Sequence, residues 1–475
     1  MKKLLQLSVC LFAFGFNSWS QPGTVCWREI SAGQNFSLAI KSDGTLWGWG
    51  QNSNQLGLGF TGNQSAPIQI GTANNWLTVS AGANHSLAVK MNGTLWSWGN
   101  GQFGHLGNGL FNSATWNVTQ VGTATDWSSV SAGTVFSLAL KTNGTLWSWG
   151  RNDTGQLGNN TTVDLNIPTQ VGTATDWMLI DAGEQHSLAI KTNNSMWAWG
   201  ANGFGQLGNG NNTTSLVPIQ VTAALTWIAI SAGGGHSMAI NNLNSLWTWG
   251  KNLNGQLGDG TILDSNLPLY IQINAAGAVS TVLKISAGQS HSMIILNDNT
   301  LWTSGLNLAG QLGLANNTNT NTFNIVGLQN TWDKISAGHQ HSLALEFTSN
   351  LWSTGRNMEG QLGIGNTIAS NILMLVACPN SSSASIHENK LYRWNLEAFP
   401  NPCNGIVNLK FNTEISEKIK LSLYDLQGNQ LQSVIEDMVT GENYKTINLS
   451  NEASGIYFLV AEGNGYKETI RLAKN

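Results

Sequence analysis

The stretch SAGTVFSLALKTNGTLWSWG, residues 131–150, decides the fold of this chain, because variants of it occur seven times between residues 27 and 365. The glycine of its Ala-Gly step recurs at intervals of 49, 51, 50, 50, 55 and 50 residues. Such a period is typical of propellers and solenoids. The seven glycines are Gly33, Gly82, Gly133, Gly183, Gly233, Gly288 and Gly338.

Each of the seven units is expected to contain four short β-strands. Residues 136–141 and 146–149 form two of them, joined by a tight turn at Asn143-Gly144. Later units place Asn or Ser at the turn (residues 193–194, 298–299 and 349–350), where Asn adopts a positive φ at modest cost. Flanking strands are expected at positions such as 177–180 and 167–171. Four strands make one propeller blade.

The units also carry a family resemblance. Residues 231–258 contain Ser-Ala-Gly-Gly-Gly-His-Ser, Leu-Trp-Thr-Trp-Gly and Asn-Gly-Gln-Leu-Gly in order, and they resemble the repeats of the regulator of chromosome condensation superfamily. The resemblance covers about residues 27–378 and implies an all-β, seven-bladed β-propeller. It implies little about function, because that propeller hosts nucleotide exchange factors, chromatin binders and bacterial protein inhibitors.

The recurring tryptophans and histidines are interpreted as structural. Each Trp can bury roughly 150 to 250 Å², which suits a core position. Phe36 and Phe136 occupy the histidine slot in units one and three, and Phe neither binds a metal nor transfers a proton. We therefore expect each slot histidine to pack internally with one hydrogen bond. These residues are His85, His186, His236, His291 and His341. Outside the slot, His105 and His339 are expected to be surface variation.

The repeat region carries little charge. Between residues 27 and 378 there are 14 acidic and 10 basic side chains, a net charge of 10 − 14 = −4. An ordinary domain has roughly 25% charged residues, whereas here they are 24 of 352. Because no basic stripe is available to hold phosphates, nucleic acid is not an expected partner.

Two cysteines flank the repeats. The first unit begins at Cys26, and residues 371–377 read as a strand after the last unit. We predict that this strand completes the first blade and closes the ring. Alignment with another unit then places Cys378 three residues from Cys26 across one turn, within the ~5 to 6 Å Cα separation that a disulfide needs. A Cys26–Cys378 disulfide is predicted on this basis; the alternative is two unrelated free thiols.

The first 20 residues read as a secretory signal peptide. Two lysines precede a mostly apolar run at residues 4–16, and small residues stand before Gln21. Cys10 lies inside the apolar run, so lipidation is not expected. No other apolar run of about 20 residues occurs, and no membrane-spanning helix is expected.

The last part of the chain has a different composition. Residues 379–395 read as a linker, and residues 396–475 read as strands of a small β-sandwich. Phe-Pro-Asn-Pro, Leu-Tyr-Asp-Leu-Gln-Gly and Gly-Ile-Tyr-Phe stand in the order found in the C-terminal sorting domain of type IX secretion, which this segment resembles. The motif residues are Phe399, Pro400, Asn401, Pro402, Gly405, Tyr424, Asp425, Gly428, Gly455 and Tyr457.

That resemblance implies contact with the type IX secretion machinery, passage through the outer membrane, and removal of the domain. The protein is then released or attached to the cell surface. Cys403 has no partner in this scheme, and a sandwich with an independent binding role is the alternative.

The function expected from these features is non-catalytic recognition by an exported, monomeric propeller without cofactor or metal. Its ligand would be an extracellular protein or glycan, held by loops such as residues 60–66, 111–117, 161–166 and 315–322. A secreted protein inhibitor is one alternative. Nucleotide exchange or chromatin binding is disfavoured, because an exported protein meets neither partner.

A polysaccharide-active enzyme is the other alternative. Such chemistry needs paired carboxyl groups or a base of shifted pKa. Asp181 and Glu184 are the best acidic candidates in the repeats, since other acidic residues stand mostly in turns.

Overall fold

The computed structural model describes residues 26–275, 278–327, 329–379, 396–413, 416–425, 429–463 and 466–474. The predicted signal peptide, residues 380–395 of the predicted linker and Gly428 lie outside these ranges. The chain divides into two compact units, Met1–Asn380 and Ser381–Asn475. All regular secondary structure in the described residues is β-strand.

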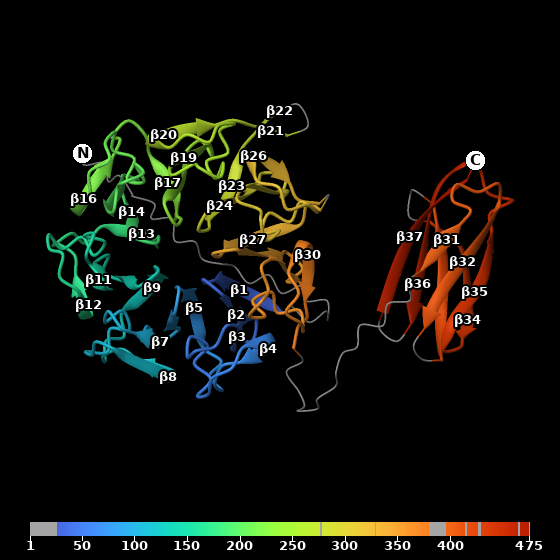
Figure 1. Cartoon of the computed structure of the whole chain (residues 1–475), viewed down its shortest axis with the longest axis horizontal. Helices are drawn as coiled ribbons and strands as arrows, with labels where there is room; N and C mark the ends of the chain where they lie inside the picture. Colours follow the sequence, from blue (N-terminus) through green and yellow to red (C-terminus); the bar gives the residue numbers. More distant parts are fainter. Residues whose placement is uncertain are drawn as a thin grey trace, which may run out of the picture. The chain divides into compact units, whose positions relative to one another are not determined.

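The first unit is a seven-bladed β-propeller (Figure 1). Each blade is a four-stranded antiparallel sheet, with its first strand near the centre and its fourth at the rim. Blades one to four are β1 (Trp27–Ala32), β2 (Phe36–Lys41), β3 (Leu46–Gly50), β4 (Gln64–Gln69); β5 (Trp76–Ala81), β6 (His85–Lys90), β7 (Leu95–Gly101), β8 (Ser113–Gln120); β9 (Trp127–Ala132), β10 (Phe136–Lys141), β11 (Leu146–Gly150), β12 (Leu165–Gln170); and β13 (Trp177–Ala182), β14 (His186–Lys191), β15 (Met196–Gly200), β16 (Ser215–Val221).

Blades five to seven repeat this arrangement. Their strands are β17 (Trp227–Ala232), β18 (His236–Asn241), β19 (Leu246–Gly250), β20 (Ser265–Ile271); β23 (Val282–Ala287), β24 (His291–Leu296), β25 (Leu301–Gly305), β26 (Thr320–Ile325); and β27 (Trp332–Ala337), β28 (His341–Glu346), β29 (Leu351–Gly355), β30 (Ser370–Val376). The 55-residue interval contains an extra hairpin of β21 (Ile273–Ala275) and β22 (Ala278–Ser280). This hairpin joins blade five to blade six.

The predicted hairpin turn joins the second and third strands of each blade. In blade three, Asn143 Oδ1 accepts hydrogen bonds from the backbone N–H and the hydroxyl of Thr145, and Trp147 Nε1 donates to that hydroxyl. Gly144 has a φ of 75°, which an L side chain rarely adopts. In blade seven the residue of positive φ is Ser349, not the Asn beside it.

The tryptophans join neighbouring blades. Trp199 of blade four is fully buried, and its Nε1 donates to the carbonyl oxygen of Gln156 in blade three at 2.9 Å. The hydroxyl of Ser187 donates to the same oxygen. In blade six Ser304 stands in the Trp position, and Phe323 of the outer strand fills the space against Gly258. Core packing therefore survives loss of this Trp, as the structural interpretation requires.

The ring closes without exchange of a strand between its ends. β30 pairs with β29, and the first blade already has four strands of its own. The prediction that residues 371–377 complete the first blade was therefore wrong. The repeat begins at its Trp strand, so the apparent orphan strand is simply the fourth strand of blade seven. Blades one and seven lie side by side (Figure 1) and are joined by the Ala32–Ser336 hydrogen bond, which has an equivalent at every junction. The Ser37–His341 and Trp49–Gln361 hydrogen bonds, which recur at most of the other junctions, join them as well.

Cys26 and Cys378 form a disulfide with a Cα–Cα distance of 6.0 Å. The pairing is the predicted one, although the strand exchange used to derive it does not occur. The two cysteines meet because the start of β1 and the end of β30 reach the same face of adjacent blades. The bond links residues 352 positions apart and clasps the ring at the junction between blades one and seven.

The second unit is a β-sandwich of two sheets. One contains β31 (Glu397–Phe399), β32 (Ile406–Thr413) and β35 (Gly441–Asn448); the other contains β34 (Gln430–Met438), β33 (Glu417–Tyr424), β36 (Gly455–Gly463) and β37 (Tyr466–Lys474). Apolar side chains such as Phe411, Leu421 and Leu459 form its core. Cys403 is a buried free thiol in this core.

Candidate binding site at the centre of the propeller

A closed circle of hydrogen bonds surrounds the propeller axis. In each blade the Ser of Ser-Ala-Gly, or Asp181 in blade four, accepts a hydrogen bond from the Ala N–H of the next blade. The seven pairs are Ser31–Ala81, Ser80–Ala132, Ser131–Ala182, Asp181–Ala232, Ser231–Ala287, Ser286–Ala337 and Ser336–Ala32, at 2.8 to 3.0 Å. The last pair joins blade seven to blade one by the same type of hydrogen bond and so closes the ring.

The glycines of this step allow the blades to approach closely. A Cβ on any of the seven would lie 2.5 to 2.7 Å from the carbonyl oxygen of the next blade's glycine. Their φ angles are not positive. Glycine is therefore required at these positions by space and not by backbone conformation.

The slot histidines extend this network. Each donates from Nε2 to a serine hydroxyl of the next blade at 2.9 to 3.0 Å. The donor is the histidine because each serine already donates its proton to a backbone carbonyl. Burial lowers the pKa of His186 to about 4 and, with neighbouring histidines adding to the effect, that of His236 to about 3. The slot histidines are packed and hydrogen-bonded, as the sequence predicted, and their lowered pKa values show in addition that they are neutral near pH 7.

A cavity of about 210 Å³ opens inside the circle of hydrogen bonds. It is lined by the Ser-Ala-Gly segments of all seven blades and by the residue that follows each glycine. Unlike the segment before it, this following residue differs between blades: Gln34, Ala83, Thr134, Glu184, Gly234, Gln289 and His339. Sequence comparison of the copies singled out loops as variable and named Glu184 and His339 individually, but it did not group these seven positions, which only the ring brings together.

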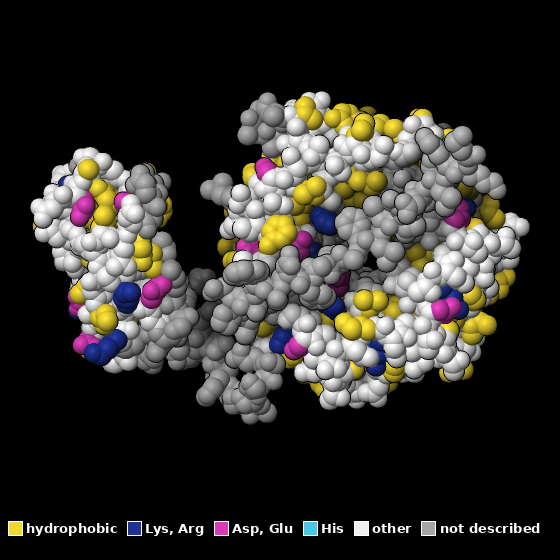
Figure 2. Space-filling view, turned by 180° about the vertical axis from the view of Figure 1, so that it is seen from behind, with side chains coloured by type: hydrophobic (Ala, Val, Ile, Leu, Met, Phe, Trp, Pro, Cys, Tyr) yellow, Lys and Arg dark blue, Asp and Glu magenta, His cyan; other side chains and the backbone are white. Residues whose placement is uncertain are grey.

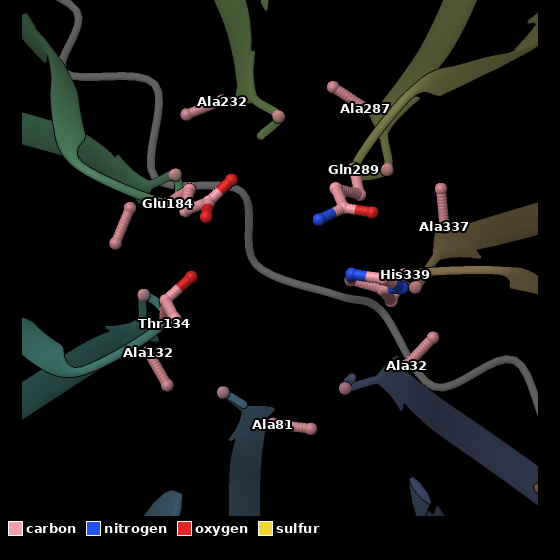
Figure 3. A pocket seen from close by; sticks show the side chains of 18 of the residues that line it. Ala32, Ala81, Ala132, Thr134, Glu184, Ala232, Ala287, Gln289, Ala337 and His339 are labelled. Atoms are coloured by element: carbon pink, nitrogen blue, oxygen red, sulfur yellow. The ribbon is translucent and has the colours of Figure 1, made fainter. Parts of the chain in front are cut away.

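Five of the seven residues that follow the glycines have polar side chains. Thr134 and Glu184 point into it from one side, and Gln289 and His339 from the other (Figure 3); Gln34 belongs to the same lining. All five are half-buried. Among the described residues none of these side chains forms a hydrogen bond or ion pair, although four of the five backbone N–H groups bond to glycine carbonyls. Convergent polar groups without partners are the usual mark of a binding site.

The two predicted acidic candidates occupy different environments. Asp181 belongs to the closed circle: its carboxylate accepts bonds from the Ser131 hydroxyl and the N–H groups of Ala182 and Ala232. Burial raises its pKa, and these bonds oppose the rise. Glu184 instead points into the cavity, where burial raises its pKa while Lys251 acts in the opposite direction. Both residues line the cavity, but only Glu184 has a carboxylate that receives no hydrogen bond from the ring among the described residues.

Two expectations about histidines need correction. His105 is 1% exposed and packs edge-to-face on His85, with ring centroids 4.6 Å apart, so it is part of the interior and not surface variation. It replaces the buried Gln of the other blades, and its backbone carbonyl still receives Ser137 and Trp149. His339 lines the cavity. Burial and the nearby charge of Arg356 lower its pKa, so its ring is neutral, and its Nδ1 is buried without a partner among the described residues.

The predicted recognition loops lie on the same face as the cavity. Connections between first and second strands and between third and fourth strands end on one face of an antiparallel blade, here called the cavity face. The second-to-third turns end on the opposite, hairpin face. Leu253, Leu308 and Met358 occupy equivalent positions of adjacent blades on the cavity face and are 66 to 71% exposed. They form an apolar arc outside the cavity.

Charged side chains are sparse on the surface. On the face seen in Figure 2, Lys and Arg side chains occur singly or beside acidic ones, without a continuous basic patch among the described residues. Local pairs such as Arg151–Asp153 and Arg356–Glu359 neutralise several of the cations. In the described part of the chain no group of three or more His, Cys, Asp or Glu side chains is arranged to hold a metal ion.

Most of the predicted sorting-motif residues lie in or beside strands of the sandwich. Phe399 ends β31, and peptide bonds before Pro400 and Pro402 are cis. Asn401 Oδ1 accepts from the N–H of Ala473, which connects this first motif to the last strand. Tyr457 is buried, and its hydroxyl donates to Ala453 O at 2.6 Å. The remaining described motif residues are Gly405, Tyr424, Asp425 and Gly455.

Comparison with known families agrees with both architectures. Residues 15–294 match the RCC1-like domain, and residues 282–311 match the regulator of chromosome condensation (RCC1) repeat. The chain belongs to the RCC1-like domain family. Residues 397–475 match the secretion system C-terminal sorting domain. This RCC1-like protein therefore carries a sorting domain of the type IX kind, which indicates export to the cell surface or medium. Among its described residues no helix is long and apolar enough to cross a membrane.

Solved structures share the propeller fold. Human WBSCR16 is 23% identical, with a TM-score of 0.62 over 67% of this chain and 86% of the other. Prp20p from Saccharomyces cerevisiae, described with its binding to Gsp1p and histones, is 21% identical, with a TM-score of 0.60 over 72% and 86%. Yeast RCC1 (Prp20) bound by Kap60 is 18% identical, with a TM-score of 0.60 over 79% and 91%. At these identities the likeness establishes the fold alone.

Proposed function

We propose that this protein is an exported recognition protein that binds an extracellular ligand on the cavity face of its propeller without catalysing a reaction. The observation that carries the proposal is the convergence of five unpartnered polar side chains from five blades on one cavity. A rigid ring that presents variable groups side by side suits recognition. The solved relatives described above with protein partners are consistent with binding as the task of this fold.

The absence of catalysis is supported by the environment of the acidic groups. Glycoside hydrolysis uses two carboxyl groups on either side of the scissile bond. Asp181 also lines the cavity, but its oxygens accept hydrogen bonds of the ring, which leaves Glu184 as the cavity carboxylate without a hydrogen bond among the described residues. A single carboxylate binds a ligand but does not supply both proton-transfer roles.

The sorting domain supplies the route in this proposal. It directs the chain to the type IX secretion machinery, is then removed, and leaves the propeller released or attached to the cell surface. The propeller acts as a monomer, since one ring contains the whole cavity.

The proposal is tested by capture of extracellular material on the immobilised full-length protein. Replacing Leu253, Leu308 and Met358 together by Ser changes the cavity face and is expected to reduce capture. A matched control replaces three similarly exposed apolar residues of the hairpin face by Ser: Met91, Leu243 and Phe347. Equal loss in both variants, or loss in the control alone, would contradict a binding role for the cavity face.

A further inference from the structure

The cavity is a slot and not a symmetric funnel. Thr134 and Glu184 on blades three and four form one wall, and Gln289 and His339 on blades six and seven form the other (Figure 3). Gln34 of blade one, the neighbour of blade seven in the ring, belongs to the same lining. Between the walls, blades two and five carry Ala83 and Gly234, the two smallest residues of the seven. A Cβ on Gly234 would lie 2.9 Å from Cγ of Gln289, so Gln289 partly covers the blade-five end. The walls are lowest at these two blades, which suits a linear chain that crosses the mouth.

The lining offers donors and acceptors in similar numbers. Gln34 and Gln289 each present an amide that donates and accepts, and the Thr134 hydroxyl does both. His339 offers one ring nitrogen, Nε2, because its Nδ1 is buried. Glu184 adds a carboxylate acceptor. A hydroxyl group also donates and accepts at one atom, so a polyhydroxylated ligand can satisfy all of these groups.

Charged ligands match the slot less well. A phosphate, or the carboxylate of an acidic sugar, brings acceptors and a negative charge, and it would meet the Glu184 carboxylate, whose charge is already poorly solvated. An ammonium group brings only donors, which leaves the amide and hydroxyl protons of the walls unpaired, and Lys251 already supplies a positive charge beside Glu184. A peptide segment offers amides, but Ala83 and Gly234 provide no pocket for its side chains.

The blade-five end borders an aromatic ring. A Cβ on Gly235 would lie 3.3 Å from Cδ2 of Phe204 and 3.3 Å from Cβ of Lys251. Lys251 Nζ lies over the Phe204 ring, 4.8 Å from its centroid, and Phe204 is 41% exposed. The apolar C–H face of a sugar can pack on the part of the ring that Lys251 leaves exposed, while its hydroxyls remain in water.

We infer that the slot binds a neutral, linear glycan chain, with one sugar held between Glu184 and Gln289 and the next packed over Gly234-Gly235 against Phe204. The inference rests on the proposed binding function and names its ligand class. The cavity volume of about 210 Å³ is smaller than the roughly 300 to 1,000 Å³ of drug-sized ligand pockets. It therefore accommodates a short stretch of chain and not a branched one.

Calorimetric titration of the full-length protein with neutral linear oligosaccharides tests the inference. The probes are β-1,4-glucan, xylan, mannan and α-1,4-glucan fragments of about five sugars, with oligogalacturonate and oligoalginate as anionic counterparts. We expect a neutral series to bind, and Glu184→Gln to weaken it about tenfold or more, because a hydrogen bond to a charged acceptor is lost. Gln289→Ala and Phe204→Ala should each weaken it about two- to tenfold. Gln102→Ala, an exposed Gln of the cavity face outside the slot, should have no effect.

The remaining outcomes separate the two proposals. Preference for the anionic probes, or unchanged affinity in the slot variants, would overturn the glycan inference. Capture of an extracellular protein that is lost in Glu184→Gln, with no oligosaccharide bound, would also overturn it but leave the proposed binding function standing. If no slot variant and no cavity-face variant reduces the binding of either a glycan or a protein, both the glycan inference and the proposed binding function are wrong.

Discussion

The Ser-Ala-Gly segments and the residues that follow them lie side by side around the propeller axis but differ in kind. Six of the seven segments have Ser at the first position, and every one takes part in the closed circle of hydrogen bonds. The residues that follow the glycines range from Gly234 to Glu184, and their side chains have no hydrogen-bond partner among the described residues. The difference shows that the first region builds the ring, whereas the second is free to define a ligand.

The largest expected effect is the pH dependence of the free energy of unfolding, which comes from the buried slot histidines and not from the cavity residues. Each slot histidine has a pKa lowered from 6.5, to about 3 for His291 and His341. Below pH 6.5 the unfolded chain takes up protons that the folded chain does not, so stability falls with pH by roughly 1.4 kcal/mol per pH unit for each histidine. The fall continues to the folded pKa of about 3 to 4. Asp181 and Glu184, whose pKa values are raised, act in the opposite direction but are fewer.

Denaturant unfolding at pH 7 and at intervals down to pH 4.5 measures this slope. His236→Phe copies the residue present in blades one and three and should reduce the slope by about 1.4 kcal/mol per pH unit. A stability that does not change between pH 6.5 and 4.5 would show that the histidines are not neutral ring components.

The disulfide gives the next largest effect. Reduction, or replacement of Cys26 and Cys378 by Ser, should lower the free energy of unfolding by up to roughly 5 kcal/mol in the chain-entropy model, because the bond closes a very long loop. The blades should stay closed, since hydrogen bonds also join blades seven and one. Unfolding with and without reductant measures the loss, and the double variant should not respond to reductant. If the double variant has the same free energy of unfolding as the original protein, the disulfide does not stabilise the ring.

Replacing a glycine of the Ser-Ala-Gly circle by Ala should lower the free energy of unfolding more than replacing a glycine outside the circle. Gly233→Ala places a Cβ 2.5 Å from the Gly288 carbonyl oxygen and against the His236 ring, and we expect a loss of about 3 kcal/mol from overpacking. Gly203→Ala is the matched control, because its Cβ meets nothing within 4 Å and its φ is not positive. Thermal unfolding of both variants compares them, and equal melting temperatures would refute the steric role of Gly233.

The smallest effect on stability is expected in the cavity itself. Glu184→Gln should leave the free energy of unfolding within about 0.5 kcal/mol of the original, because the carboxylate has no hydrogen-bond partner to lose among the described residues. The same denaturation experiment provides the check. A loss comparable to that of Gly233→Ala would mean that Glu184 supports the ring, and would remove it from the candidate site.

The seven-fold sequence phrase by itself determined the blades, the hairpins and the packed role of Trp199 and His236. It could do so because strand alternation, turn residues and repeat length are local properties. The motifs of residues 396–475 likewise indicated the sorting domain, and the ends of the repeat region indicated the disulfide partners Cys26 and Cys378. The phrase failed at the ring junction, because strand pairing between chain ends is not local, and it assigned His105 to the surface because burial depends on the neighbouring blade.

Only the tertiary structure decided where the site lies. Gln34 and His339 are 305 positions apart in the sequence and become neighbours through ring closure. Asp181 and Glu184 looked equivalent in the sequence, yet one turns to the next blade and the other to the cavity. The physical reason is that a propeller converts the same position of successive repeats into a circle, so groups spaced about 50 residues apart act on one ligand.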